Sequence, residues 1–263
     1  MSLFTPSGGL VYHLRALRYG RTLWAPYRAA LAAWLERSLP LADELILVGP
    51  SAGHCLPLVR LGAFGRLVAL EPDPLARRLL QLRLPRARFE LEPRDLLLGP
   101  LLSGAPGLDD VLQRRPRASV LFCNLLGQLH WELPEEQQAR FRAEFARRVL
   151  PLLSGRSWAS FHDRWSVDGA QAPGLASTLH FPRCPSDEEL AAACFGLSAA
   201  PVTALDHGAS QLFPEALPRS YFGWQLTPQA LHVVEGVAGG AKVSSAPRRT
   251  ARPHSRRGSG WPL

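Results

Sequence analysis

The chain has 263 residues, of which 46% are hydrophobic and 20% charged, an ordinary globular composition that predicts one main domain. No window approaches the roughly 20 uninterrupted apolar residues of a membrane helix, and the amino terminus lacks the basic segment of a secretory leader. These absences argue against an exported or membrane protein, so we expect a cytoplasmic location and no membrane partner.

The cysteines and the charge argue against a metal site and a nucleic-acid partner for the folded body. The four cysteines form no C-x-x-C pair and no zinc spacing, so we expect free thiols and no metal site. The net charge is +8, but six basic residues and no acid lie in 237–263, which leaves +2 for residues 1–236. A nucleic-acid partner is therefore possible but disfavoured for the folded body. The cysteines are Cys55, Cys123, Cys184 and Cys194.

Apolar side chains between residues 11 and 39 recur every three or four positions, which predicts helix divided in two at Pro26. After Pro40 the pattern changes to short apolar runs that alternate with helix or loop segments. This alternation predicts a parallel sheet with helices on its faces. The predicted strands lie in 44–49, 65–72, 87–93, 118–124 and 155–163.

The second half of the chain contains further helices and closing strands. Residues 134–153 have the clearest helical pattern, with glutamates at the start and arginines near the end, and Ser186 is a good cap for a short helix over 187–194. Closing strands are predicted at 201–207, 220–227 and 230–237, the last two as a hairpin around Pro228. We expect a helical cap (1–40), a binding domain (41–236) and a disordered basic tail (237–263).

The turn after the first predicted strand is rich in small residues. Gly49 and Gly53 are separated by three residues, and a helix is predicted to start near Cys55. In open α/β sheets such a turn lets a nucleotide approach the backbone closely. Neither the G-x-G-x-x-G fingerprint of dinucleotide sites nor a phosphate loop is present, since the first lysine is Lys242. Glu71, at the end of the second strand, could accept hydrogen bonds from both hydroxyls of a ribose.

The stretches LVGPSAG, VALEPDPLARRLL, RDLL and VLFCNLLGQL, in this order, resemble the class I S-adenosylmethionine-dependent methyltransferases over residues 41–165. The resemblance implies a three-layer α/β fold, Rossmann-like and mostly parallel with an antiparallel C-terminal strand, and S-adenosyl-L-methionine as the cofactor. One position departs from the family, because Leu47 occupies the place of its usual first acid.

The resemblance also implies which residues hold the cofactor. Gly49 and Gly53 match the first and third glycines of the family's turn, with Pro50 and with Ser51 in place of the second glycine between them. Glu71 matches the ribose-binding acid. Asp95 matches the acid that reaches the adenine amino group, with a backbone N–H from Leu96 beside it. Asn124 falls on the methionine and acceptor side.

Methyl transfer is an in-line displacement, so the enzyme supplies alignment and, for weak nucleophiles, a base. The candidate catalytic residues are Asn124 after the fourth strand and His162 in the fifth. A direct pair between His162 and Asp163 is not expected, because neighbours on a strand point to opposite faces, and a purely structural His162 stays an alternative. Other residues expected near the acceptor are His130, Trp131, Asp163 and Trp165, and the aromatic residues of the first helices could shape its pocket.

Three functions stay open at this point. The sequence favours a methyltransferase that acts on a small-molecule or peptide acceptor. Leu47 and the lack of an evident base leave an inactive methyltransferase-like binding module as an alternative. The arginine-rich tail leaves a nucleic-acid methyltransferase as another.

Overall fold

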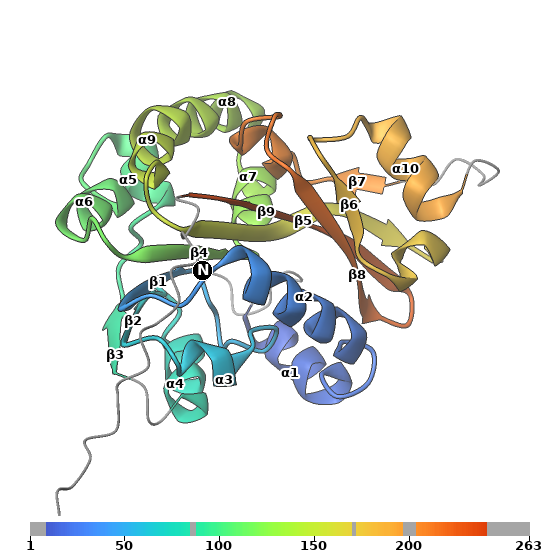
Figure 1. The fold of residues 1–263 in the computed structure, drawn as a ribbon, viewed down its shortest axis with the longest axis horizontal. Coiled ribbons are helices and arrows are strands. Elements are labelled where there is room, and N and C mark those ends of the chain that lie inside the picture. The colour runs from blue at the N-terminus through green and yellow to red at the C-terminus, as the bar shows by residue number, and fades with distance from the viewer. Residues whose placement is uncertain (1–8, 85–87, 170–171, 197–203, 241–263) are drawn as a thin grey trace, which may run out of the picture.

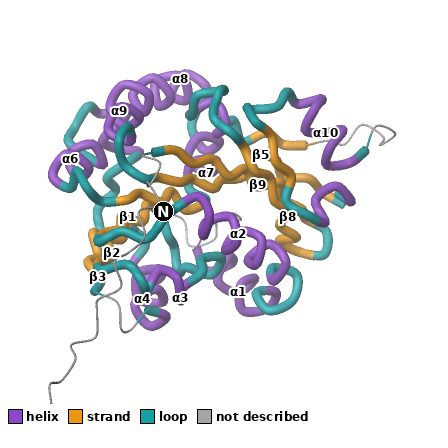
Figure 2. Tube along the Cα trace, viewed as in Figure 1, coloured by secondary structure: helices purple, strands orange, loops and turns teal. Residues whose placement is uncertain are grey.

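In the computed structural model, residues 9–84, 88–169, 172–196 and 204–240 form three layers, with helices on both faces of a central sheet (Figure 1). Figure 2 shows the strands running through the middle of the molecule between the two helical layers. The predicted Rossmann-like α/β fold is confirmed by this arrangement. Its five parallel strands are β1 (Glu44–Val48), β2 (Arg66–Leu70), β3 (Phe89–Glu92), β4 (Ser119–Cys123) and β5 (Trp158–Asp168).

The other strands extend the sheet beyond β5. Within the described residues the order is β3-β2-β1-β4-β5-β9-β8-β6, and the short β7 also pairs with β5. The predicted hairpin at Pro228 is confirmed, since β8 and β9 pair antiparallel and β9 also pairs antiparallel with β5. These strands are β6 (Leu179–Phe181), β7 (Ala204–Asp206), β8 (Arg219–Thr227) and β9 (Ala230–Gly239).

The strand order creates a crevice at the carboxyl ends of the parallel strands. β1 lies between β2 and β4, so the chain leaves β1 toward one side and returns to β4 on the other. In such sheets ligands bind where the order reverses, outside the carboxyl ends of the strands. The turns after β1, β2 and β4 meet at this point.

The first helical layer covers one face of the sheet and contains the predicted amino-terminal pair. Pro26 lies in the first turn of the second helix, where its missing N–H costs nothing. Trp24 and Trp34 are buried in the core, as expected for packing residues. The layer consists of α1 (Gly9–Tyr19), α2 (Ala25–Ser38), α3 (Leu58–Leu61) and α4 (Pro74–Arg83).

The second layer covers the opposite face. The predicted helix over 134–153 is confirmed, but it widens to a π-helical turn over Phe145–Val149 just before Pro151. Because proline has no N–H, it interrupts the hydrogen-bond ladder and the helix accommodates the break with a wider turn. The helices are α5 (Leu98–Ser103), α6 (Leu108–Arg114), α7 (Leu126–Glu132), α8 (Glu135–Glu144) and α9 (Leu150–Leu153).

The remaining elements follow β5 in the chain. Ser186 and Glu189 form a capping box at the start of α10 (Asp187–Phe195), which confirms the predicted cap. Two 3-10 turns, η2 (Pro173–Ala176) and η3 (Ala209–Leu212), complete the connections.

Two boundary predictions are wrong. The helix after the glycine turn begins at Leu58 and not near Cys55, because Pro57, with a ψ of 80°, has a non-helical backbone. The tail does not begin at residue 237, since the backbones of Ala238 and Gly239 still pair with β5. The rest of the predicted tail, 241–263, lies outside the described residues, as do 1–8 of the predicted cap and 201–203 of a predicted strand. The domain boundary at residue 40 stays a prediction.

The described residues contain neither a candidate membrane span nor a candidate metal site. No helix there is both long and apolar enough to cross a bilayer. No group of three or more His, Cys, Asp or Glu side chains there could hold a metal ion.

Candidate functional site

The turn after β1 has an unusual backbone. Gly49, Ser51 and Gly53 have φ angles of +64°, +50° and +67°. A Cβ on Gly49 would lie 2.6 Å from Cδ2 of Leu125, and a Cβ on Gly53 would lie 2.9 Å from Cδ1 of Leu80. Both glycines are therefore required by backbone conformation and by close side-chain packing. Ser51 carries a side chain in a region that non-glycine residues rarely adopt, which is typical of functional turns.

Glu71 joins the turns after β1 and β2. Its side chain is buried, with 6% of the residue exposed. Oε2 accepts a hydrogen bond from the Ser51 N–H at 2.8 Å, and Oε1 accepts one from the Asp73 N–H at 3.0 Å. Burial raises the pKa of Glu71 even though these two backbone N–H groups favour the charged form. Each oxygen keeps a lone pair, so the carboxylate can accept two more hydrogen bonds.

A cavity of about 120 Å³ lies beside Glu71 at this edge of the sheet. It brings together four of the predicted cofactor residues: Gly49, Glu71, Asp95 and Leu96. The other predicted residues, Pro50, Ser51, Gly53 and Asn124, do not line it. Most of its wall is apolar and comes from Val48, Leu70, Pro72, Leu97, Leu98, Leu125 and Leu129, with Arg94 at its side.

Asp95 lies at the cavity but uses much of its hydrogen-bonding capacity locally. Its Oδ1 accepts from the Leu97 and Leu98 N–H groups at 2.9 and 3.0 Å, and its Oδ2 accepts from the Gly99 N–H at 2.7 Å. The carboxylate therefore satisfies the first N–H groups of α5. Contact with an adenine amino group depends on the remaining lone pair of Oδ2 and stays a prediction.

Asn124 follows β4 with a φ of +50°, a conformation that asparagine tolerates better than most residues. Its Nδ2 donates to Oδ2 of Asp163 at 3.3 Å, and its buried Oδ1 has no partner among the described residues. Asp163 is 1% exposed, and its Oδ1 lies 3.2 Å from Nδ1 of His232. Burial alone would raise the pKa of Asp163, but His232, His207 and Asn124 together outweigh it and lower that pKa.

His232 is a site residue that sequence reasoning missed. It lies in β9 directly opposite Ser166 of β5, and its Nε2 is 3.4 Å from the Ser166 hydroxyl. The same hydroxyl lies 2.8 Å from Nε2 of His207. A register shift in β5 between Asp163 and Trp165 places Asp163 and Ser166 beside the same histidine. No local sequence pattern could reveal a contact that depends on this shift.

His162 faces the other side of the sheet, and its position does not support the predicted catalytic role. Its side chain is completely buried, Nδ1 lies 3.0 Å from the Ser160 hydroxyl, and Nε2 lies 3.4 Å from Oε1 of Glu235. Glu235 also binds Nε of Arg219 at 2.9 Å and the Tyr221 hydroxyl at 2.8 Å. The His162 side chain is 0% exposed, whereas that of His232 is 16% exposed, so His162 belongs to an internal network that an acceptor does not reach.

The other residues expected near the acceptor have different surroundings. Nδ1 of His130 lies 3.1 Å from the His207 carbonyl oxygen, and its Nε2 accepts a hydrogen bond from Arg142 at 2.7 Å. Trp131 is half exposed, whereas Trp165 is buried in a small core beside β8 and β9. Only Asp163 of this group contacts Asn124.

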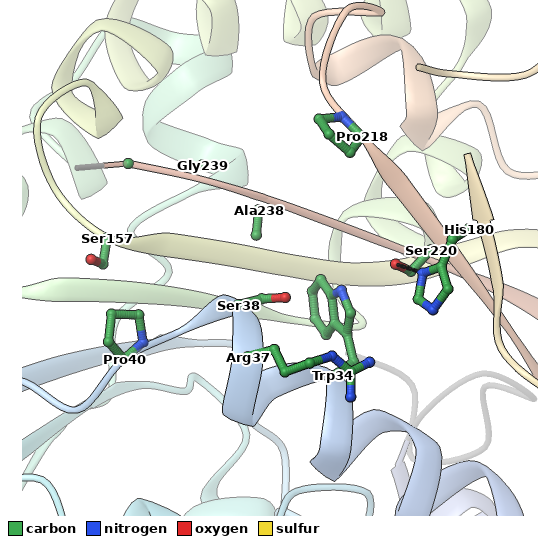
Figure 3. A pocket seen from close by; sticks show the side chains of 11 residues that line it. Trp34, Arg37, Ser38, Pro40, Ser157, His180, Pro218, Ser220, Ala238 and Gly239 are labelled. Carbon is green, nitrogen blue, oxygen red and sulfur yellow. Dashed lines mark hydrogen bonds between the residues drawn. The ribbon is translucent and has the colours of Figure 1, made fainter. Parts of the chain in front are cut away.

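A larger cavity, of about 500 Å³, lies at the amino end of the parallel strands, where β5 begins. In Figure 3, Trp34 and Arg37 of α2 lie on one side of it, with Ser220 and His180 on the other. None of the predicted site residues lines this cavity. The crevice beside Glu71 is therefore the candidate functional site, although its cavity is the smaller one.

No protein-family model and no curated protein matches the chain. Among solved structures, it is similar to the N-methyltransferase NodS from Bradyrhizobium japonicum WM9 in complex with S-adenosyl-L-homocysteine. That match has 12% identity, a TM-score of 0.44, and covers 88% of this chain and 99% of that chain. A second is the SAM-dependent methyltransferase from Anabaena variabilis ATCC 29413, with 13% identity, a TM-score of 0.42, and 89% and 98% coverage.

A third similar structure is the glycopeptide N-methyltransferase MtfA, with 14% identity, a TM-score of 0.37, and coverage of 82% of this chain and 90% of that chain. Identities and TM-scores this low assign no function to the chain. Its activity has to be inferred from its own crevice.

Proposed function

We propose that the chain is an S-adenosylmethionine-dependent methyltransferase that binds its cofactor in the crevice beside Glu71. The observation that supports this most directly is the buried Glu71 carboxylate, bonded to the Ser51 N–H and lining the cavity. Among the described residues no cation forms an ion pair with this carboxylate. Arg77 contributes a nearby positive charge, but its guanidinium donates to the backbone oxygens of Glu71 and Pro72. A buried carboxylate without a hydrogen-bonded cation is costly, and a ribose diol supplies two donors that would satisfy it.

The other walls of the cavity suit the rest of a nucleoside. Leu97, Leu125 and Leu129 offer apolar surface for a purine ring, and Asp95 and Leu96 offer polar groups at its edge. In this proposal the turn from Gly49 to Gly53 lies near the amino acid end of the cofactor. The cofactor itself supplies the activated methyl group.

Leu125 lines this cavity beside the glycine turn. The cavity volume of about 120 Å³ is well below the roughly 300–1,000 Å³ of typical ligand sites. A Cβ on Gly49 would lie within 3.0 Å of three Leu125 side-chain atoms, so this side chain lies directly over the turn. We infer that Leu125 changes rotamer when the cofactor enters.

We propose His232 as the general base in place of His162, with Asp163 as the acid that orients it. Asp163 orients the imidazole through Nδ1, and Asn124 holds the other carboxylate oxygen. Asn124 directly follows β4, and Asp163 lies next to it within β5, on the side predicted for the acceptor. In this proposal His232 accepts the proton that a weakly nucleophilic acceptor loses as its new bond to the methyl group forms. The acceptor is proposed to be a small molecule or a peptide.

Calorimetric titration of the full chain with S-adenosylmethionine and S-adenosylhomocysteine tests the cofactor proposal. We expect one saturable site for each. Absence of binding by the folded protein would refute the proposal.

A screen with methyl-labelled cofactor separates the enzyme from an inactive module. Leu47 is completely buried in the core, so it offers no substitute for the missing acid, and this observation keeps the inactive module as the second candidate. Label transfer to any small molecule or peptide would establish the enzyme. Cofactor binding with no transfer across a broad acceptor screen would favour the binding module.

A further inference from the structure

Four basic side chains form a cluster between the amino-terminal helices and the turn after β1. Nδ1 of His13 in α1 lies 3.2 Å from Nε2 of His54, the residue after Gly53. Nη1 of Arg83, at the end of α4, lies 3.2 Å from Nδ1 of His54, and its Nη2 donates to the Gly53 carbonyl oxygen at 3.4 Å. Arg28 of α2 is close enough to lower the pKa of both His54 and Arg83.

The direction of these hydrogen bonds follows from chemistry. A guanidinium only donates, so Nδ1 of His54 accepts from Arg83. In a neutral imidazole the other nitrogen then carries the proton, so Nε2 of His54 donates to Nδ1 of His13. By the same rule Nε2 of His13 carries a proton. The chain of donors therefore ends in an N–H group on His13.

This terminal N–H has no acceptor, and two more N–H donors in the cluster also lack one. Nε2 of His13, Nε of Arg28 and Nε of Arg83 are all buried without a hydrogen-bond partner among the described residues. His13 itself is only 4% exposed. A buried donor left unpaired costs roughly 1–3 kcal/mol, so three in one cluster require an explanation.

The cluster also lacks a counter-charge. Within the described residues, no carboxylate forms a hydrogen bond or ion pair with the side chains of the cluster. Burial, Arg83, His13 and Arg28 together lower the pKa of His54 to about 4. Burial lowers the pKa of His13, and the negative charge of Asp73, which forms no ion pair with it, opposes this shift without cancelling it. The missing partner is thus an acceptor and a negative charge at once.

We propose that His13, Arg28, His54 and Arg83 form a binding site for a small oxyanion, either a carboxylate or a phosphate group. Arg28, His54 and Arg83 are half-buried, so the cluster is reached from the surface. An oxyanion accepts hydrogen bonds from several N–H groups and offsets the repulsion among the basic groups. The Arg83 contact to Gly53 places the site beside the proposed cofactor crevice. The anion is therefore either the carboxylate of the cofactor or a separate anion, such as an acidic group of the acceptor.

Titration of the full chain with inorganic phosphate, followed through the imidazole ¹H–¹⁵N signals, tests the site. We expect saturable shifts of His13 and His54 and a rise of both imidazole pKa values. Arg83→Met should weaken phosphate binding about tenfold or more, the effect of losing a charge-assisted hydrogen bond. Arg78→Met, on the exposed side of the same helix, is the matched control and should bind phosphate within about twofold of the unmutated chain. If Arg83→Met does not fold, His54→Gln takes its place.

A second arm identifies the source of the anion by comparing S-adenosylhomocysteine with methylthioadenosine, which lacks the carboxylate. If Arg83→Met weakens binding of only the former, the site holds the cofactor's carboxylate. If it weakens only phosphate binding, the site holds a separate anion.

The oxyanion proposal falls if phosphate leaves His13 and His54 unchanged and Arg83→Met binds S-adenosylhomocysteine normally. It also falls if phosphate binds equally well to Arg83→Met. If phosphate binds as expected while S-adenosylhomocysteine does not bind at all, the oxyanion site stands and the proposed function fails. The two proposals are thus tested separately.

Discussion

Replacing Glu71 by glutamine tests the proposed ribose contact with little change in shape. The amide oxygen can still accept one hydrogen bond from Ser51 or Asp73, but the amide nitrogen is a donor that faces the other N–H. The loss of one acceptor for a buried N–H should lower the free energy of unfolding by about 1–3 kcal/mol. The folded protein should persist, since typical domains have about 5–15 kcal/mol of stability.

The effect of Glu71→Gln on cofactor binding is expected to be larger in relative terms. A ribose hydroxyl that donates to a carboxylate contributes about 1.5–3 kcal/mol, and the amide loses one such bond. Affinity for S-adenosylhomocysteine should therefore fall about 10- to 150-fold. Calorimetry at a temperature where both proteins are folded measures this change.

Glu92→Gln is the matched control. Glu92 lies at the end of the neighbouring strand β3, but its carboxylate pairs with Arg94 and does not line the cavity beside Glu71; it lines an adjacent groove that shares Leu70 and Arg94 with that cavity. Its replacement should leave S-adenosylhomocysteine binding within about twofold, because exposed ion pairs contribute little. The reasoning would be refuted if Glu71→Gln bound as tightly as the unmutated chain, or if both variants lost affinity equally.

Three further predictions follow from the same geometry. Gly49→Ala should lower the unfolding midpoint more than Gly155→Ala: both residues have positive φ, but only a Cβ on Gly49 meets another side chain, so equal losses in thermal unfolding would contradict the packing argument. His162→Gln should lower the free energy of unfolding in urea by about 1–3 kcal/mol because it disturbs the buried polar contacts with Ser160 and Glu235, while cofactor affinity of the folded fraction stays unchanged; a selective loss of affinity would return His162 to the site. Burial raises the pKa of Glu71 in the folded state above its ordinary 4.5, so the folded state binds this proton more tightly than the unfolded state does. The difference in unfolding free energy between the unmutated chain and Glu71→Gln should therefore shrink as pH rises from about 4.5 through the raised pKa. A difference that grows with pH in paired urea titrations would contradict this.

The parallel sheet was predictable because its signal is local. The apolar runs at β1 and β4 are buried on both faces, so hydrophobic residues occupy consecutive positions. The glycine turn and Glu71 follow two of these runs directly, and strand ends of a parallel sheet meet at one edge. Their proximity therefore followed from the sequence order alone.

The acceptor side was less predictable because its contacts are distant in sequence. His232 meets Asp163 only through the pairing of β5 with β9 and the register shift within β5. Alternation along a strand placed His162 and Asp163 on opposite faces, but it could not tell which face lies at the crevice. Leu125, which lies over Gly49, was hidden for the same reason, and β6 has only three residues and too weak a pattern to detect.

The most direct test of the central claim is a crystal structure of the chain with S-adenosylhomocysteine. We expect both ribose hydroxyls within about 2.5–3.0 Å of the Glu71 carboxylate oxygens, with the adenine against Leu97 and Leu129 and with Leu125 turned away from Gly49. A nucleoside bound elsewhere, or one bound in the crevice with no ribose contact to Glu71, would contradict it.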